Sequence, residues 1–310
     1  MRRVFEILLV EDNEGDVRLT REALAVRGAA VRLRAVGDGE GALACVRREG
    51  AWAAVPRPDL IILDLNLPGR DGWEVLAVLK ADAGLRGIPV VVLTGSERAA
   101  DVAQAYDLHA NCYIIKPLDA GKFEAVLGMV GRFWLETVHL PGVCVAAAGE
   151  FVRDGGRRCW ACELLAMEKQ IKILLVEDNP ADALLTREAL KQGMGNAVLS
   201  HVPDGVEAVD FLNRRGRYAE APRPDLILLD LNLPRKSGRE VLAEIKMDVR
   251  LRAIPVVILS TSQAADDVNR AYELYANCYV SKPMEFSSFL EVVGAIKGFW
   301  GTVAQLPDRG

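Results

Sequence analysis

Four polar residues occur twice in this chain with the same spacing. They are Asp12, Asp64, Thr94 and Lys116, and they recur 166 positions later as Asp178, Asp230, Ser260 and Lys282. A constant offset means that no insertion or deletion separates these residues in one copy relative to the other. Because internal repeats report the architecture of a chain, two carboxylates, a hydroxyl and an ammonium kept at fixed spacing indicate one kind of site built twice.

The carboxylates stand where apolar segments end. Asp64 closes one strand-like apolar run, and Glu11 and Asp12 directly follow another. Ligands of open α/β sheets bind at the carboxyl ends of the strands, and three acidic groups gathered there repel one another. A hard divalent cation such as Mg²⁺ relieves this repulsion. The alternative is that Glu11, Asp12 and Asn13 only cap the following helix, but this leaves Asp64 unexplained.

A hydroxyl and an ammonium follow two further strand-like runs. Thr94 ends the fourth run and Lys116 precedes Pro117 at the end of the fifth. Taken alone, the lysine would be a solvated charge and the threonine a strand-end hydroxyl bonded to backbone. Beside an acidic cluster, both are able to hold a phosphoryl oxygen. The set therefore predicts phosphoryl transfer to the carboxylate of Asp64.

Alternating short apolar runs and amphipathic stretches must position these residues. In the first repeat the expected strands are Ile7–Val10, Val31–Val36, Leu60–Leu63, Val90–Leu93 and Cys112–Ile115. The expected helices are Asp16–Arg27, Gly39–Arg48, Trp73–Ala81, Arg98–His109 and Lys122–Thr137. Continuous Ile, Leu and Val composition is typical of a parallel sheet covered on both faces. The second repeat follows at the same offset, which predicts two α/β domains of (βα)5 type.

Length and composition agree with two domains. The 310 residues are 51% hydrophobic and 26% charged, as expected for globular domains with their own cores. We expect one domain over residues 1–141, a linker over 142–169 and a second domain over 170–310. A net charge of −5 argues against a nucleic-acid partner, and no apolar run is long enough to cross a bilayer. Without a signal-peptide pattern, we expect a cytoplasmic protein that has no membrane partner.

The six cysteines do not suggest a disulfide framework. Cys112 and Cys278 are repeat equivalents inside apolar runs, where a thiol behaves as a small hydrophobic group. Cys159 and Cys162 have C-x-x-C spacing, but they lack the second Cys/His pair of a zinc site and the setting of a redox motif. Incidental linker cysteines are the favoured interpretation.

The motifs in combination resemble the receiver domain of two-component response regulators, which has a flavodoxin-like, doubly wound parallel sheet. The matching segments are Val10-Glu11-Asp12-Asn13, Leu63-Asp64-Leu65-Asn66-Leu67-Pro68, Leu93-Thr94-Gly95-Ser96 and Ile115-Lys116-Pro117, with equivalents in the second copy. The resemblance implies that a histidine kinase phosphorylates Asp64 and Asp230, with Mg²⁺ as cofactor. It also implies self-catalysed phosphorylation and dephosphorylation only, rather than an enzyme that acts on a separate substrate.

The resemblance further assigns roles within each site. Asp12 and Asp178 would ligate Mg²⁺ directly alongside Asp64 and Asp230, and Glu11 and Glu177 would act through water. The backbone carbonyls of Asn66 and Asn232 would complete the ligands. The Lys116–Pro117 and Lys282–Pro283 bonds would be cis.

Two tyrosines occupy the family's switch position. Tyr113 precedes Lys116 by three residues, and Tyr279 is its equivalent in the second copy. In the family such a residue moves inward when the switch hydroxyl, here Thr94 or Ser260, moves toward the phosphoryl group. The alternative is that both tyrosines simply pack on the sheet.

Within the family, the chain most resembles phytochrome-associated single-domain response regulators. The segments Leu108–Tyr113 and Phe133-Trp134 carry this likeness and recur as Leu274–Tyr279 and Phe299-Trp300. The likeness implies a kinase of the bacteriophytochrome type, no output domain, and pairing through the face made by the fourth helix, fifth strand and fifth helix. Because aromatic residues are enriched in interfaces, both aromatic pairs are expected there, within one chain or between chains. Core packing is the alternative.

Three other functions stay open. An aspartyl-phosphate hydrolase of the haloacid-dehalogenase type needs a second Asp two residues after the nucleophile, where this chain has Asn66 and Asn232. A regulatory module of a larger enzyme would need a catalytic domain, and none follows Gly310. The third open function is that one copy acts as a non-phosphorylated pairing scaffold, although both copies keep every acceptor residue.

Overall fold

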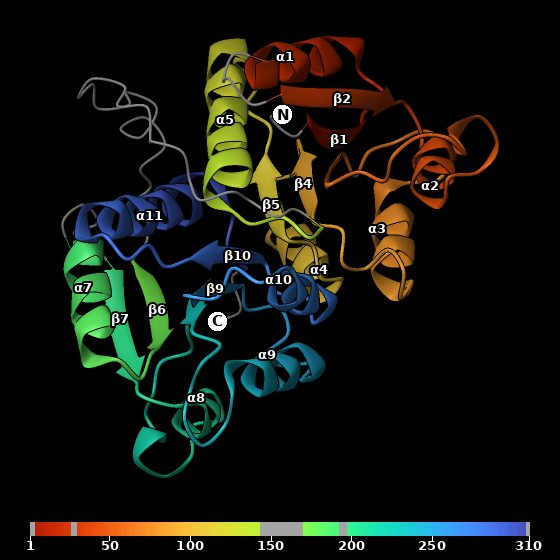
Figure 1. The fold of residues 1–310 in the computed structure, drawn as a ribbon. Coiled ribbons are helices and arrows are strands. Elements are labelled where there is room, and N and C mark those ends of the chain that lie inside the picture. Colours follow the sequence, from red (N-terminus) through yellow and green to blue (C-terminus); the bar gives the residue numbers. More distant parts are fainter. Residues whose placement is uncertain (1–3, 26–29, 143–169, 192–196, 308–310) are drawn as a thin grey trace.

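The protein, described as a computed structural model, folds into two parallel sheets of five strands each with helices on both faces (Figure 1). The structure describes residues 4–25, 30–142, 170–191 and 197–307. The prediction of two α/β domains with doubly wound parallel sheets is confirmed.

The first domain contains these strands: β1 (Val4–Val10), β2 (Ala30–Val36), β3 (Leu60–Leu63), β4 (Val90–Thr94) and β5 (Cys112–Ile115). Its helices are α1 (Glu14–Ala25), α2 (Gly39–Arg47), α3 (Gly72–Ala81), α4 (Ala99–Asp107) and α5 (Ala120–Arg132). A 3₁₀ turn, η1 (Gly50–Trp52), follows α2, and a π-helical turn, η2 (Phe133–Thr137), extends α5.

The second domain contains the strands β6 (Ile171–Val176), β7 (Ala197–Val202), β8 (Leu226–Leu229), β9 (Val256–Ser260) and β10 (Cys278–Ser281). Its helices are α7 (Pro180–Lys191), α8 (Gly205–Leu212), α9 (Gly238–Met247), α10 (Ala265–Glu273) and α11 (Phe286–Gly298). The turns η3 (Gly216–Tyr218) and η4 (Phe299–Val303) occupy the places of η1 and η2.

The strand order explains where a site can form. The first sheet runs β2-β1-β3-β4-β5, and the second has the equivalent order β7-β6-β8-β9-β10. The central strands β3 and β4 are buried along their whole length, which accounts for their continuous Leu, Ile and Val composition. Because the chain turns in opposite directions from β1 toward β2 and β3, a crevice opens at the carboxyl ends of β1 and β3.

The edge strands β5 and β10 face each other across the two domains (Figure 1). The segment that follows each final helix covers the other domain's edge strand. The Gln305 amide donates to the Tyr113 carbonyl at 2.8 Å, and the His139 amide donates to the Tyr279 carbonyl at 2.8 Å. Ile114 and Ala304 also form an antiparallel bridge. An edge strand exposes unpaired backbone groups, so each domain protects the other's edge.

Aromatic side chains fill the space between the two terminal helices. The rings of Phe133 and Phe299 stack with centroids 4.0 Å apart and planes at 6°. Trp134 and Trp300 are buried beside them, and Trp134 meets Phe299 edge to face. The contacts of this face are therefore reciprocal, as in an isologous dimer, although both halves belong to one chain.

Several sequence-based expectations lie outside the described residues. They include the Cys159-x-x-Cys162 spacing and the linker expected over residues 142–169, of which only Gly142 is described. Cys112 and Cys278 are buried, as expected for hydrophobic thiols. In the part of the chain that the structure describes, no helix is long and apolar enough to cross a membrane.

Candidate functional site

In each domain, five of the predicted site residues lie at or just after the carboxyl end of a strand. In the first domain Asp64 follows β3, Glu11 and Asp12 follow β1, Thr94 ends β4, and Lys116 follows β5. In the second domain the same positions are occupied by Asp230, Glu177, Asp178, Ser260 and Lys282. The parallel sheet thus brings residues from four strands to one edge in each domain.

The lysine ammonium joins the carboxylates of each site. Lys116 Nζ lies 2.5 Å from Asp64 Oδ2 and 2.5 Å from Glu11 Oε2. Lys282 Nζ makes the same two contacts, each 2.5 Å long, with Asp230 and Glu177. Charge-assisted hydrogen bonds of this kind are the strong ones, so the ammonium offsets part of the repulsion among the carboxylates.

The second carboxylate oxygen of Asp64 and of Asp230 also accepts a hydrogen bond. The Asn66 amide donates to Asp64 Oδ1 at 3.1 Å, and the Asn232 amide donates to Asp230 Oδ1 at 3.0 Å. Asp64 and Asp230 are each only 6% exposed. Both side chains are therefore held in one orientation at the mouth of the sheet edge.

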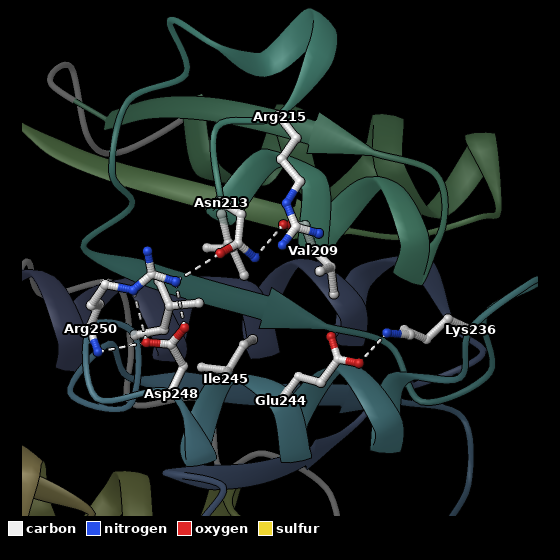
Figure 2. Close-up of a pocket in the computed structure, with 10 residues that line it drawn as sticks. Val209, Asn213, Arg215, Lys236, Glu244, Ile245, Asp248 and Arg250 are labelled. Atoms are coloured by element: carbon white, nitrogen blue, oxygen red, sulfur yellow. Dashed lines mark hydrogen bonds and ion pairs between the residues drawn. The ribbon is translucent and has the colours of Figure 1, made fainter.

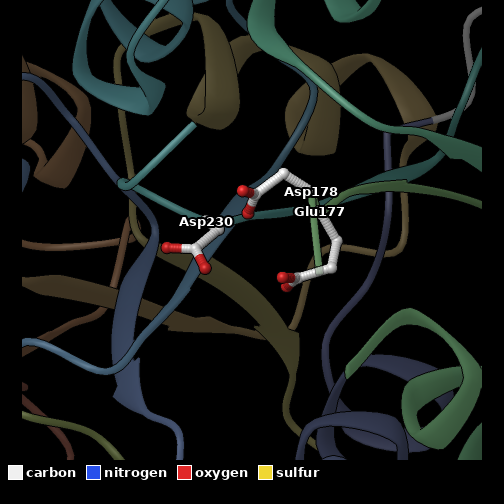
Figure 3. A group of neighbouring side chains, drawn as sticks. All are labelled: Glu177, Asp178 and Asp230. Carbon is white, nitrogen blue, oxygen red and sulfur yellow. The ribbon is translucent and has the colours of Figure 1, made fainter. Parts of the chain in front are cut away.

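Three carboxylates of the second site surround a common space. Ligand oxygens of Glu177, Asp178 and Asp230 all lie within 4.8 Å of one another, and Figure 3 shows their carboxyl groups turned toward that space. Two of the three are buried, while Asp178 is exposed. Carboxylate oxygens at this spacing suit a hard divalent cation, so the donor set fits the predicted metal ion.

Burial perturbs the ionisable groups of both sites. It raises the pKa of Glu11 above its usual value despite the opposing effect of Lys116. In the second site burial raises the pKa of Glu177 to about 7. Burial by itself would lower the pKa of Lys116, but its bonds to Asp64 and Glu11 outweigh that effect and raise the pKa. The lysine is therefore positively charged at neutral pH.

The hydroxyls of Thr94 and Ser260, which were expected to act as switch residues, have different partners. Thr94 Oγ1 lies 3.5 Å from Asn66 Nδ2, whereas Ser260 Oγ accepts the Ser262 amide at 3.4 Å. Both side chains are fully buried. The methyl group that distinguishes Thr94 from Ser260 thus coincides with a difference in hydrogen bonding.

Both tyrosines that were expected at the switch position point inward. Tyr113 and Tyr279 are fully buried, and their hydroxyls donate to the carbonyls of Ser96 at 2.9 Å and Ser262 at 2.8 Å. The backbones of the same two tyrosines accept the interdomain bonds from Gln305 and His139. Each tyrosine therefore contacts both the loop after the fourth strand of its own domain and the partner domain.

The aromatic residues predicted for an interface lie away from the carboxylates. Phe133 and Trp134 belong to η2, and Phe299 and Trp300 belong to η4. Phe299 contacts both Phe133 and Trp134 across the two domains.

Sequence reasoning missed one carboxylate in each site. Asp16 Oδ2 lies 3.0 Å from Lys116 Nζ, and Asp182 Oδ2 lies 3.2 Å from Lys282 Nζ. These two aspartates obey the same offset of 166 positions. Their recurrence in both copies was therefore the signal that could have identified them as site residues. It was not decisive, because the helix dipole also favours an acidic residue in a first helical turn.

Two glycines beside the acceptors were missed as well. A Cβ at Gly72 would lie 2.2 Å from the Asp64 carbonyl oxygen, and one at Gly238 would lie 2.0 Å from that of Asp230. The amino ends of α3 and α9 therefore approach the acceptor backbone closely only because these positions carry no side chain.

The expectation of cis Lys–Pro bonds is wrong. The described residues, which include Lys116–Pro117 and Lys282–Pro283, contain no cis peptide bond. The trans isomer is intrinsically favoured even before proline, and each lysine reaches its carboxylate partners from that isomer.

A separate pocket lies between α8 and α9 of the second domain (Figure 2). Its volume is about 410 Å³, and none of the predicted site residues lines it. Two of the cations that line it pair with acidic residues: Arg250 lies 2.7 Å from Asp248, and Lys236 pairs with Glu244. The pocket is therefore distinct from the strand-end sites.

Comparison with known proteins identifies the class of these domains. Residues 7–127 and 173–294 match the family model of the response regulator receiver domain. The chain belongs to this family and contains two receiver domains in tandem, which we call receiver one and receiver two.

Among curated proteins, the response regulator Rcp1 of Synechocystis sp. is 49% identical over 135 residues, which cover 44% of this chain and 92% of Rcp1. The response regulator PleD of Caulobacter vibrioides is 26% identical over 288 residues, which cover 90% of this chain and 56% of PleD. Among solved structures, the phosphorylated cyanobacterial phytochrome response regulator RcpA is 46% identical with a TM-score of 0.44, and the match covers 45% of this chain and all of that one.

Proposed function

We propose that the protein is a phosphoacceptor response regulator with two acceptors, Asp64 and Asp230. The observation that carries this proposal is the lysine ammonium held 2.5 Å from the acceptor oxygen in both receivers. A buried carboxylate with a fixed ammonium beside it suits phosphoryl transfer, in which positioning and charge neutralisation supply most of the rate enhancement. A histidine kinase is the proposed donor.

The reaction exchanges one bond to phosphorus for another. An oxygen of Asp64 attacks phosphorus, the bond from phosphorus to the donor's histidine nitrogen breaks, and its electron pair stays on that nitrogen. Lys116 offsets negative charge on the phosphoryl oxygens, and the Asn66 amide keeps the carboxylate oriented. In receiver one, Mg²⁺ would be held by Glu11, Asp12 and Asp64 together with the Asn66 carbonyl. In receiver two, it would be held by Glu177, Asp178 and Asp230 together with the Asn232 carbonyl. When bound, Mg²⁺ supplies charge neutralisation at the transferred group.

We further propose that the surface formed by α4, β5 and α5 pairs with that of α10, β10 and α11 within one chain. The reciprocal backbone bonds to Tyr113 and Tyr279 and the stacked rings of Phe133 and Phe299 support this. Because each tyrosine bonds both to the loop after the fourth strand of its own receiver and to the other receiver, phosphorylation would alter the pairing through it. The segments Leu108–Tyr113 and Leu274–Tyr279, which resemble those of phytochrome-associated regulators, support a bacteriophytochrome as the kinase.

Incubation with acetyl phosphate and Mg²⁺ tests the acceptor assignment. The samples are wild type, Asp64→Asn, Asp230→Asn and the double variant, and tandem mass spectrometry of borohydride-reduced peptides locates each acyl phosphate. We expect label at both aspartates in wild type and at the remaining one in each single variant. Acyl phosphate at another residue in the double variant would refute the assignment.

A further inference from the structure

A fourth carboxylate contacts the lysine of each acceptor site. Asp16 and Asp182 lie in the first turns of α1 and α7, and each accepts a hydrogen bond from the lysine ammonium. The contact occurs independently in two receivers. The side chains of the two aspartates are also almost equally exposed, 26% for Asp16 and 27% for Asp182.

The ammonium has no donor to spare. Lys116 has three N–H groups, and they point to three carboxylates: Glu11, Asp64 and Asp16. Phosphorylation would turn the Asp64 carboxylate into an acyl phosphate, and a bound cation would compete for Glu11. Asp16 is the one partner that the proposed reaction leaves unchanged.

The start of the helix does not require the carboxylate of Asp16. Asn13 Oδ1 accepts the amides of Gly15 and Asp16 at 2.8 and 3.2 Å, so the asparagine already caps α1. In receiver two, Asn179 accepts the Ala181 amide at 2.9 Å. The Asp16 side chain turns instead toward Lys116, a contact 100 positions away in the sequence.

We propose that Asp16 and Asp182 are positioning residues that hold the lysine ammonium in place before and after phosphoryl transfer. With the ammonium anchored on the helix side, the N–H that points to Asp64 Oδ2 in the resting site points to the incoming phosphoryl group. The residue acts through the lysine and forms no bond to phosphorus. This inference rests on the proposed phosphoacceptor function.

The test isolates receiver one in an Asp230→Asn background and adds Asp16→Ala, Asp16→Asn or, as a matched control, Glu14→Ala. Glu14 is an exposed acid of the same helical turn and has no hydrogen bond to Lys116. Initial rates of acyl phosphate formation are measured against acetyl phosphate concentration at saturating Mg²⁺. Calorimetry measures the Mg²⁺ dissociation constant of each variant.

We expect Asp16→Ala to lower the maximal rate about tenfold, because positioning acts on the transition state. The half-saturating acetyl phosphate concentration and Mg²⁺ affinity should stay within about threefold, as expected when ground-state binding is retained. Asp16→Asn, which keeps an acceptor oxygen, should recover part of the rate, and Glu14→Ala should match the parent.

An unchanged rate in Asp16→Ala would overturn the inference, as would a loss explained wholly by weaker Mg²⁺ binding. Failure of the proposed function looks different, because the parent with Asp16 intact would then not be labelled at Asp64. If Asp16→Ala does not fold, Asp182→Ala and Asp182→Asn in an Asp64→Asn background give the same comparison in receiver two.

Discussion

The side-chain amide of Asn111 in receiver one donates to the backbone carbonyl of Asn277 in receiver two, and Asn277 returns the same bond to Asn111, each at 3.0 Å. The oxygen of each side chain meanwhile serves its own receiver. Asn111 Oδ1 accepts the Val90 amide at 2.9 Å and the buried ammonium of Lys80 at 3.0 Å. One asparagine thus joins the core of its receiver to the other receiver.

Replacing Asn111 with leucine should therefore destabilise the protein and weaken the pairing. The substitution leaves buried donors and acceptors on both sides of the interface without partners, at a cost of about 2 to 4 kcal/mol. Urea unfolding measures the loss. Asn213→Leu is the matched control, because the Asn213 side chain bonds to Val209 and Arg250 within receiver two. Equal losses in the two variants would contradict an interface role for Asn111.

Removing one ring of the central stack should separate the receivers. Phe133 is only 3% exposed, and truncation of a buried phenylalanine costs about 3 to 5 kcal/mol. We expect Phe133→Ala to increase the radius of gyration measured by X-ray scattering. Phe211→Ala serves as control, since Phe211 is buried against Tyr218 inside receiver two. It should lower stability without changing the radius; an unchanged radius in Phe133→Ala would argue against pairing through this stack.

A methyl group at Gly72 should disturb the acceptor loop. The Cβ of Gly72→Ala would lie 2.2 Å from the Asp64 carbonyl oxygen, so the start of α3 must shift. We expect a loss of about 3 kcal/mol from overpacking and slower labelling of Asp64. Gly128→Ala in α5, where a Cβ meets open space, should instead stabilise by about 0.5 to 1 kcal/mol. A well-folded Gly72→Ala protein labelled at the normal rate would contradict the close approach.

Acid should weaken the protein through two interface histidines. Burial, together with nearby Lys246, Lys80 and Arg252, lowers the pKa of His109 to about 3. In the unfolded chain a histidine pKa is about 6.5. Between those values the unfolded state binds a proton that the folded state does not, so stability is full above pH 6.5 and falls as pH drops toward 3. The slope is at most about 1.4 kcal/mol per pH unit for each such residue.

The repeat itself supplies the variants for this test. His109 stacks on Tyr275, with centroids 3.9 Å apart, and the two are repeat equivalents. Burial also lowers the pKa of His139, and the repeat equivalent of this histidine is Gln305. Urea unfolding at pH 7.5 and 5 should show a smaller acid loss in His109→Tyr and His139→Gln than in wild type. An identical loss in all three proteins would exclude these histidines as the cause.

The fold and the principal site could be predicted because their signals are local. Continuous apolar runs such as Leu60–Leu63 predicted buried parallel strands, and the observed β3 has these bounds. A polar residue directly after such a run, such as Asp64, must lie at the sheet edge. The reciprocal bonds of Asn111 and Asn277 could not be predicted, since recurrence alone does not separate a residue that maintains the fold from one that joins two domains.

Other features could not be predicted, because they depend on how parts of the chain that are distant in the sequence meet in the folded protein. Asp16 looks in the sequence like an ordinary acid of a first helical turn, and only the fold brings it to Lys116. The π-helical turn η2 (Phe133–Thr137) also replaces the continuous helix that the pattern over Lys122–Thr137 predicted.

The central claim is that one chain carries two complete acceptor sites. Intact-mass spectrometry after saturating treatment with acetyl phosphate and Mg²⁺ counts phosphoryl groups per chain most directly. We predict two in wild type, one in either Asp64→Asn or Asp230→Asn, and none in the double variant. A wild-type chain that never exceeds one phosphoryl group, with one of the single variants unaffected, would contradict the account.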